Sequence, residues 1–311
     1  DVLRPMPISI MKARLAARPG VVVSLGDGLG TAYASMQDMG FNIEEYIAVE
    51  EKQERRAVAS AHIPVYSTRL GNDATKVTNQ MLELMGDRYV IAIIASPDCP
   101  QWSNRHSNPM GFEDETSARL FVQMSEVMEQ LATKYPAAIR LMETTVVASK
   151  KGQEWKLLQE QTQSNLSVDM FEEVQAADYG SSMLRNRRIA TNADSNKWQK
   201  RDHVSAAVTM RHNCRPTRIP TLCLLSAGNS TAQPIRVVEP DGTERNITIG
   251  EAERAMGYGT GITNGFGALY VTEAARFRLM GNAICETHYR LVFGDYVPAG
   301  ELPTQILAAN V

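Results

Sequence analysis

The amino-acid sequence predicts an α/β fold, a doubly wound and mostly parallel sheet with a small β-rich insert. The chain has 311 residues, 43% of them apolar, which is enough for one large core and a small appendage. From Val21 to Met142, β-branched or apolar runs alternate with segments of helical composition. This alternation is typical of parallel strands joined by crossover helices.

The strands of the sheet are expected in the first half of the chain. Val21–Leu25 is a β-branched run, followed by a glycine turn and a helix over 31–39. Later strands are predicted at 46–49, 63–67, 89–95 and 139–142, with helices at 52–62, 80–85 and 116–135. Ligands of such sheets bind beyond the carboxyl ends of the strands. The candidate loops are therefore 26–30, 50–51, 71–73, 96–104 and 143–145.

The pattern changes at Asn186, where short β segments separated by Pro, Gly and Asn begin. They are predicted at 206–210, 221–225, 235–238 and 246–249. Helices return at 250–256 and 271–280, and Leu291–Phe293 is expected to close the core. We therefore divide the chain into a core over 1–185, an insert over 186–250 and a C-terminal segment over 251–311.

Charge is distributed unevenly along the chain. The whole sequence has a net charge of −3, but Arg185–Arg218 holds nine Lys or Arg against two Asp, a net +7 that leaves −10 elsewhere. An acidic body with one basic segment suits a protein that meets phosphates with a single face. A solvated basic loop explains the same segment, and charge alone does not decide between them.

Several classes of protein are not expected. The longest apolar run is Val90–Ala95, far short of the ~20 residues of a membrane helix. Four cysteines without a CxxC pair indicate reduced thiols, and the five histidines show no metal-ligand spacing. The chain starts at Asp1 without a signal-peptide pattern, so we expect a trimmed or excised domain. Nucleus and bacterial cytoplasm remain open as locations.

The first glycine turn indicates a nucleotide-like cofactor. Gly26, Gly28 and Gly30 would let the backbone approach a ligand, and Glu50 at the end of the next strand could take two ribose hydroxyls. Tyr33 stands where the GxGxxG pattern has its last glycine, so a pyrophosphate grip is missing. The pattern favours an adenosine cofactor without phosphates, such as S-adenosylmethionine, over NAD; a plain turn is the alternative.

The loop after the apolar run carries a thiol. Cys99 lies within Ser96–Asn104, among polar residues and prolines. A cysteine at the mouth of a cleft becomes a nucleophile when nearby cationic or N–H groups favour the thiolate. A lone cysteine is otherwise usually buried and inert, and the polar neighbours argue against burial here.

Seven motifs, in order over about 21–293, resemble the DNA cytosine-5 methyltransferases, with a layout closest to the eukaryotic de novo enzymes. Ser24–Thr31 and Glu50 resemble the first cofactor motifs, and Gly71-Asn72-Asp73 is similar to the motif that meets the adenine amine. The remaining motifs are Pro97–Ser103 for the Pro-Pro-Cys-Gln loop, Met142-Glu143-Thr144 for Glu-Asn-Val, Arg185-Asn186-Arg187 for Arg-x-Arg, and Gly281-Asn282-Ala283 for the closing Gly-Asn motif.

The resemblance implies a Rossmann-like methyltransferase that uses S-adenosyl-L-methionine and releases S-adenosyl-L-homocysteine. The implied cofactor-binding residues are Ser24, Gly26, Asp27, Gly28, Leu29, Gly30, Thr31, Glu50, Asp73, Pro97, Asn282 and Ala283. Cys99 would add to C6 of cytosine, and Glu143 would bind N3 and the exocyclic amine. Arg185 and Arg187 would donate to O2.

The resemblance also implies double-stranded DNA as the partner, with the target base flipped out of the helix. The implied DNA contacts are Ser103, Asn104, Arg188, Lys200, Arg201, Arg211, Arg215 and Arg218. On this interpretation 1–185 binds cofactor and catalyses, 186–250 recognises the target, and 251–311 returns to the core. No metal and no membrane are implied, while a homo-oligomer or a regulatory partner remains open.

Three residues depart from the family pattern. Gly26 stands in place of a Phe that lines the adenosine pocket, Asp98 in place of the Pro before the nucleophile, and Thr144 in place of an Asn. The carboxylate of Asp98 would disfavour the thiolate of Cys99. A weakly active or inactive regulatory homologue that binds DNA or a partner methyltransferase therefore stays open. An RNA cytosine-5 methyltransferase is a second alternative. Ser103 favours DNA over RNA.

Overall fold

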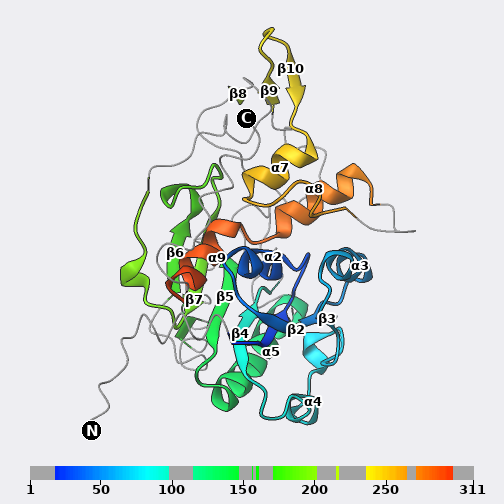
Figure 1. Cartoon of the computed structure of the whole chain (residues 1–311), viewed down its shortest axis with the longest axis vertical. Helices are drawn as coiled ribbons and strands as arrows, with labels where there is room; N and C mark the ends of the chain where they lie inside the picture. The colour runs from blue at the N-terminus through cyan, green and yellow to red at the C-terminus, as the bar shows by residue number, and fades with distance from the viewer. Residues whose placement is uncertain are drawn as a thin grey trace.

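The computed structural model describes residues 18–97, 115–146, 156, 159–160, 171–201, 215–216, 236–264 and 271–296. They form a seven-stranded sheet of order β3-β2-β1-β4-β5-β7-β6, which confirms the predicted doubly wound architecture (Figure 1). The strands are β1 (Gly20–Leu25), β2 (Ile43–Val49), β3 (Tyr66–Ser67), β4 (Val90–Ala95), β5 (Ile139–Thr145), β6 (Phe171–Gln175) and β7 (Asn186–Thr191).

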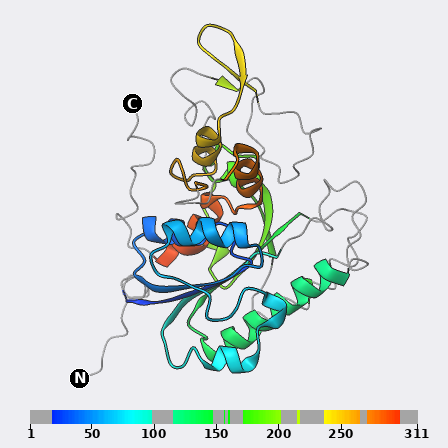
Figure 2. The same cartoon turned by 90° about the vertical axis from the view of Figure 1, so that its right-hand side faces the viewer.

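Both faces of the sheet are covered, as expected for parallel strands of nearly continuous apolar sequence. Helices α2 (Thr31–Asp38), α3 (Gln53–His62) and α9 (Glu286–Phe293) pack on one face, and α4 (Asn79–Glu83) and α5 (Glu115–Lys134) on the other (Figure 2). Alternate residues of β1 serve the two cores. Val21 and Val23 face α5, while Val22 faces α2 and α9.

The third strand is shorter than predicted, because Ile63–Val65 forms a turn after α3. The Tyr66 N–H donates to the Ile63 carbonyl, and the Ile63 side chain is buried against the glycine turn. Only Tyr66 and Ser67 pair with β2. Ile63 is therefore apolar because its side chain is buried after the end of α3, and not because it belongs to a strand.

The core sheet includes one strand that we placed in the insert. β7 pairs antiparallel with β5 and with β6, a strand that the sequence analysis did not predict. The boundary at 186 therefore lies inside the sheet, and the insert can start only after Thr191. The change of composition at Asn186 marks a change of strand direction.

The described part of the insert contains a small antiparallel sheet of β8 (Arg215–Pro216), β9 (Arg236–Val238) and β10 (Glu244–Asn246). β9 confirms the strand predicted at 235–238, whereas the predictions at 206–210 and 221–225 lie outside the described residues. The strand predicted at 246–249 is wrong beyond Asn246. There Thr248 caps helix α7 (Ile249–Ala255) through a capping box with Glu251.

The C-terminal segment forms a lobe and then returns to the sheet. α7 and α8 (Glu273–Asn282) confirm the predicted helices and pack with Leu29, Val58 and Met183 into a third apolar cluster. α9 follows, and its Val292 and Phe293 complete the core next to α2, as predicted. The short helices are η1 (Ala74–Lys76), η5 (Ala176–Asp178), η6 (Ser195–Lys197) and η8 (Gly294–Tyr296).

Among the helices in the described part of the chain, none combines the length and the apolar character needed to span a membrane.

Candidate functional site

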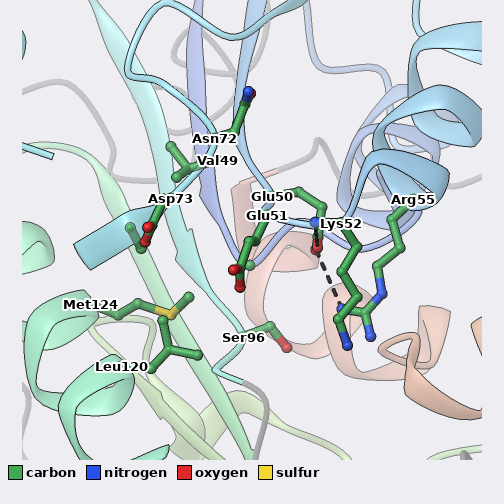
Figure 3. A pocket seen from close by; sticks show the side chains of 12 residues that line it. Val49, Glu50, Glu51, Lys52, Arg55, Asn72, Asp73, Ser96, Leu120 and Met124 are labelled. Atoms are coloured by element: carbon green, nitrogen blue, oxygen red, sulfur yellow. Dashed lines mark hydrogen bonds and ion pairs between the residues drawn. The ribbon is translucent and has the colours of Figure 1, made fainter. Parts of the chain in front are cut away.

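A pocket lies at the carboxyl ends of β1, β2 and β4, where the sequence places the candidate loops (Figure 3). Its empty space, including the part open to solvent, is about 390 Å³. Its lining comprises Gly26, Val49, Glu50, Glu51, Lys52, Arg55, Asn72, Asp73, Ala74, Ser96, Leu120 and Met124. Four candidate loops therefore meet around one space, and α5 closes it from below the sheet.

Glu50 is held rigidly at the end of β2. Its carboxylate accepts hydrogen bonds from the Gly28 and Lys52 N–H groups, both at 2.9 Å, and pairs with Arg55 at 3.4 Å. The side chain is buried although it lines the pocket. This arrangement fixes a buried acceptor beside the glycine turn, as a ribose-binding acid requires.

Gly26 brings the first turn close to the end of β4. Its φ is +68°, and a Cβ built there would lie 2.5 Å from the Ser96 carbonyl oxygen. The two segments are joined by the Ser96 N–H bond to Leu25, while the Gly26 N–H bonds to Val49. No side chain fits at position 26, so a ring at this position is incompatible with the observed packing.

The other residues of the first motif differ in where they lie. Asp27 is buried below the turn and accepts a hydrogen bond from Tyr46, and Thr31 lies 3.3 Å from the Tyr289 hydroxyl. Ser24 and Leu29 are also buried, with Leu29 in the C-terminal cluster. Gly28 and Gly30 both have positive φ, and open space surrounds the Gly28 Cβ position. A ligand at this turn would therefore contact backbone atoms, because the side chains of Ser24, Asp27 and Leu29 are buried.

Burial raises the pKa of Asp27 to about 7, and the nearby Glu50 charge contributes in the same direction. Hydrogen bonds from Tyr46 and Ser24 oppose this shift. The pKa of Tyr46 lies well above its usual value, also because of burial, so its hydroxyl remains a donor to Asp27.

Asp73 lies at the rim of the pocket and caps η1. Its carboxylate accepts from the Thr75 N–H and hydroxyl at 2.9 and 2.6 Å and pairs with Lys76 at 3.1 Å. The Thr75 hydroxyl is the main cause of a lowered pKa, so Asp73 is a stable anion. Asn72 and Asp73 both line the pocket, as the motif predicts.

A second polar cluster lies at the adjacent strand ends. Glu143 of β5 is buried, accepts a hydrogen bond from the Ser96 hydroxyl at 2.9 Å and pairs with Arg187 of β7 at 2.5 Å. The antiparallel register places Arg187 opposite Thr145 and makes this contact. The carboxylate and the guanidinium expected to act on one base are therefore together.

Arg185 has a different environment. Its guanidinium is buried and donates to the carbonyl oxygens of Gly281, at 3.1 Å, and Ala283. Asn282 between them is exposed at the end of α8. Arg185 therefore ties the closing Gly-Asn motif to the start of β7.

His288 is a residue of this region that the sequence analysis missed. It is fully buried on α9, and burial together with the charges of Arg187 and Arg185 lowers its pKa to about 3. The imidazole is neutral near pH 7 and adds no charge beside the arginines. A lone histidine in an amphipathic helix gave no signal of this position.

Several predicted residues lie outside the described residues: Asp98, Cys99, Ser103, Asn104, Arg211 and Arg218. Pro97, the last described residue of that loop, is buried. The backbone of Arg215 pairs with Val238. Arg188 pairs with Glu173 and Lys200 with Asp178, both at 3.5 Å, and Arg201 is exposed beside Tyr179.

Within the described ranges no group of three or more His, Cys, Asp or Glu side chains is arranged to hold a metal ion.

Solved structures with the same fold were found, although no family model and no curated protein sequence matches the chain. A protein assigned as a DNA modification methyltransferase from an Escherichia coli prophage is 14% identical, with a TM-score of 0.60 over 88% of this chain and 97% of that one. The Schizosaccharomyces pombe Dnmt2 methyltransferase is 11% identical, with a TM-score of 0.58 over 89% and 96%.

The Entamoeba histolytica methyltransferase EhMeth is 10% identical, with a TM-score of 0.60 over 90% of this chain and 98% of that one. These matches cover 88 to 90% of this chain and 96 to 98% of the other chains. The fold that the motifs imply is therefore confirmed, and the chain shares the Rossmann-like fold of these methyltransferase structures.

Proposed function

We propose that this protein transfers a methyl group from S-adenosylmethionine to C5 of a flipped-out cytosine in DNA, with Cys99 as the nucleophile. The observation that carries the proposal is the cluster of Ser96, Glu143 and Arg187 beside the pocket. Ser96 precedes Cys99 by three residues. One of the similar structures is named as a DNA modification methyltransferase, which favours DNA as the substrate.

The lining of the pocket supports binding of the adenosine part of the cofactor. Glu50 would accept from the ribose hydroxyls, Asp73 from the adenine amine, and the glycine turn would contact the ligand through its backbone. When bound, the cofactor's sulfonium supplies an electrophilic methyl group. The apolar side chains of Val49, Ala74, Leu120 and Met124 exclude water from one side.

The second cluster would activate the base. The Cys99 thiolate adds to C6, which moves electron density to C5 and negative charge toward N3 and O2. Glu143 would bind N3 and the exocyclic amine; its Oε1 is paired with the Arg187 Nε, and its Oε2 accepts from the Ser96 hydroxyl. Arg187 would donate to O2 while it holds Glu143 in place. C5 would then take the methyl group from the cofactor, with S-adenosylhomocysteine as the leaving group. Loss of the C5 proton to a base would let the C6–S bond break and restore the thiolate.

Arg185 acts in this proposal as a positioning residue, because its donors are directed to the carbonyls of Gly281 and Ala283. The basic residues after β7 would contact phosphates and offset the few kcal/mol that base flipping costs. The insert, with its small sheet, would recognise the target sequence.

The experiment is mechanism-based trapping with a duplex oligonucleotide that contains 5-fluorocytosine. Because fluorine at C5 cannot leave as a proton does, the C6–S bond persists and the adduct survives denaturing electrophoresis. We expect an adduct with the wild-type chain and S-adenosylmethionine, and none with Cys99→Ser. Cys285→Ser is the matched control, since Cys285 is buried beside Met256, and it should form the adduct.

A parallel reaction with an RNA oligonucleotide separates the two polynucleotide substrates. An adduct on RNA alone would establish the RNA alternative. An adduct with Cys99→Ser, or none on either substrate, would contradict the catalytic proposal.

A further inference from the structure

We propose that Glu51 is a specificity-determining residue of the pocket, whose carboxylate favours an adenosine ligand with a positive charge on its 5′ substituent over a neutral or anionic one. This inference rests on the proposed function, because the sulfonium of S-adenosylmethionine carries such a charge and the thioether of S-adenosylhomocysteine does not. It assigns a role to a residue that none of the sequence motifs includes.

The position of Glu51 gives its side chain access to the pocket. The residue directly follows Glu50 at the end of β2, and its exposed side chain lines the pocket. Figure 3 shows the carboxylate extending into the space between Asp73 and Ser96. The Arg56 guanidinium donates to the main-chain carbonyl of Glu51 and so helps to hold the backbone from which this side chain extends.

The carboxylates of the lining differ in how their charges are compensated. Glu50 pairs with Arg55 at 3.4 Å, and Asp73 pairs with Lys76 at 3.1 Å. Within the described ranges, no ion pair or hydrogen bond involves the carboxylate of Glu51, which is acceptor to Arg56 only through its main chain. Glu51 therefore brings to the pocket a negative charge that the described groups leave uncompensated.

Lys52 is a further cation of the lining, and its place differs from that of Glu51. In the view of Figure 3, Lys52 and Arg55 lie on one side of Glu50, and Glu51 lies on the other side, toward Asp73. The charges are therefore separated across the lining, so a ligand on the Glu51 side meets a negative potential.

Adenosine derivatives offer a series in which the charge of the 5′ substituent changes. S-Adenosylmethionine has a cationic sulfonium, S-adenosylhomocysteine a neutral thioether, and adenosine 5′-monophosphate an anionic phosphate. A carboxylate attracts the first of these groups and repels the last. Since screening extends over about 8 Å at physiological ionic strength, a carboxylate in the lining acts on charges held in the same pocket.

This selectivity would serve the proposed reaction. The cofactor loses its positive charge when its methyl group is transferred, so the product no longer gains from the attraction to Glu51. The carboxylate therefore favours exchange of the product for a new cofactor molecule and limits inhibition by the product.

Calorimetric titration of the full chain with the three ligands tests the inference. Glu51→Gln keeps the size of the side chain and removes its charge. We expect the variant to bind S-adenosylmethionine about fivefold more weakly, S-adenosylhomocysteine within about twofold of the wild type, and adenosine monophosphate about fivefold more tightly. Because Glu51 is exposed, its replacement should leave the melting temperature unchanged, and the affinities then report on the pocket.

Glu54→Gln is the matched control, since it removes the same charge from an exposed residue of α3 that does not line the pocket. All three affinities should stay within about twofold of the wild type. Salt gives a second readout. Added salt should lower the ratio of cofactor affinity to product affinity in the wild type and have a smaller effect in Glu51→Gln.

An unchanged ratio of cofactor affinity to product affinity in Glu51→Gln would overturn the inference. Equal changes in Glu51→Gln and Glu54→Gln would overturn it too, because the effect would then come from the overall charge of the protein. A wild-type chain that binds neither sulfur compound contradicts the proposed function itself, and the selectivity with it. Binding of both compounds with one ratio in all variants removes only the role of Glu51.

Discussion

Arg187 and Glu143 show how a single residue acquires a role through its strand partner. The two carry no special pattern individually, and they are far apart in the sequence. The register of β5 and β7 brings them into contact while both side chains are largely buried, 19% and 6% exposed. Each of the two buried charges therefore compensates the other.

Replacing Arg187 by Ala should therefore affect both stability and activity. Loss of one partner leaves a buried carboxylate uncompensated, which costs about 3 kcal/mol in unfolding free energy. We expect methyl transfer to labelled DNA to fall at least 100-fold. Arg69→Ala is the control, because Arg69 pairs with Glu45 at the amino end of β2, and it should retain activity. Equal activity in the two variants would remove Arg187 from the site.

Asp27 predicts a pH dependence of stability. Its pKa is raised from 3.8 to about 7 in the folded chain, so the folded state binds this proton more tightly than the unfolded state. The contribution of protonated Asp27 to the free energy of unfolding is fully present below about pH 4 and is lost as the pH rises to about 7. Three pH units correspond to about 4 kcal/mol as an upper limit.

Asp27→Asn keeps a neutral acceptor for Tyr46 at every pH. Urea unfolding at pH 4.5 and pH 8 should show the variant gaining stability relative to the wild type at the higher pH. Parallel changes in the two proteins would mean that Asp27 ionises normally.

The site residues whose positions could be predicted from the sequence are those near the carboxyl ends of the strands. Glu50 follows the apolar residues of β2, and Glu143 lies near the carboxyl end of β5. Asp73 lies six residues beyond β3 and was indicated by its Gly-Asn-Asp motif. Met124 and His288 could not be predicted, because their roles depend on packing between distant layers. Both look like ordinary residues of amphipathic helices.

At the scale of elements, the parallel strands were predictable because apolar runs and helices alternate. β6 and β7 were not, since two of the five residues of β6 are charged and β7 begins with Asn-Arg-Arg. Arg187 of β7 pairs with Glu143 at the candidate site, so the sequence signal of this strand is weak where it meets the site. Because the Asn-Arg-Arg start of β7 did not look like a core strand, the insert was expected to begin at 186, inside this strand.

Arg185 links two elements, and its loss should loosen α8 and α9. The guanidinium satisfies two carbonyls between these helices, and hydrogen bonds to a charged group contribute about 1.5–3 kcal/mol each. We expect Arg185→Met to reduce amide exchange protection across 279–293 by at least tenfold. Arg185→Lys should be intermediate, because one ammonium cannot reproduce the planar fork. Unchanged protection in both variants would show that the contact stabilises nothing.

At the scale of the whole molecule, the acidic body and the basic segment predict salt-dependent DNA binding. Neutralising Arg211, Arg215 and Arg218 to Gln should lower the slope of log affinity against log salt by up to about 3, since each phosphate contact contributes about 0.9. Fluorescence anisotropy with a duplex measures this slope.

The control neutralises Arg18, Arg69 and Lys134, which lie outside the basic segment, and should leave the slope within about 0.5 of the wild-type value. Identical slopes in the wild-type chain and the first variant would mean that those three arginines do not contact phosphates.

The placement of α9 has a consequence for how the protein is made. Val22, near the start of the chain, shares its core with Val292 and Phe293. While the polypeptide leaves the ribosome, strands β1 to β5 are synthesised long before this helix exists. Throughout that interval α2 and α3 cover this face of the sheet only in part, and the apolar side chains that later contact α9 stay exposed, the kind of surface that chaperones hold. This core is therefore complete only after α9 has been synthesised.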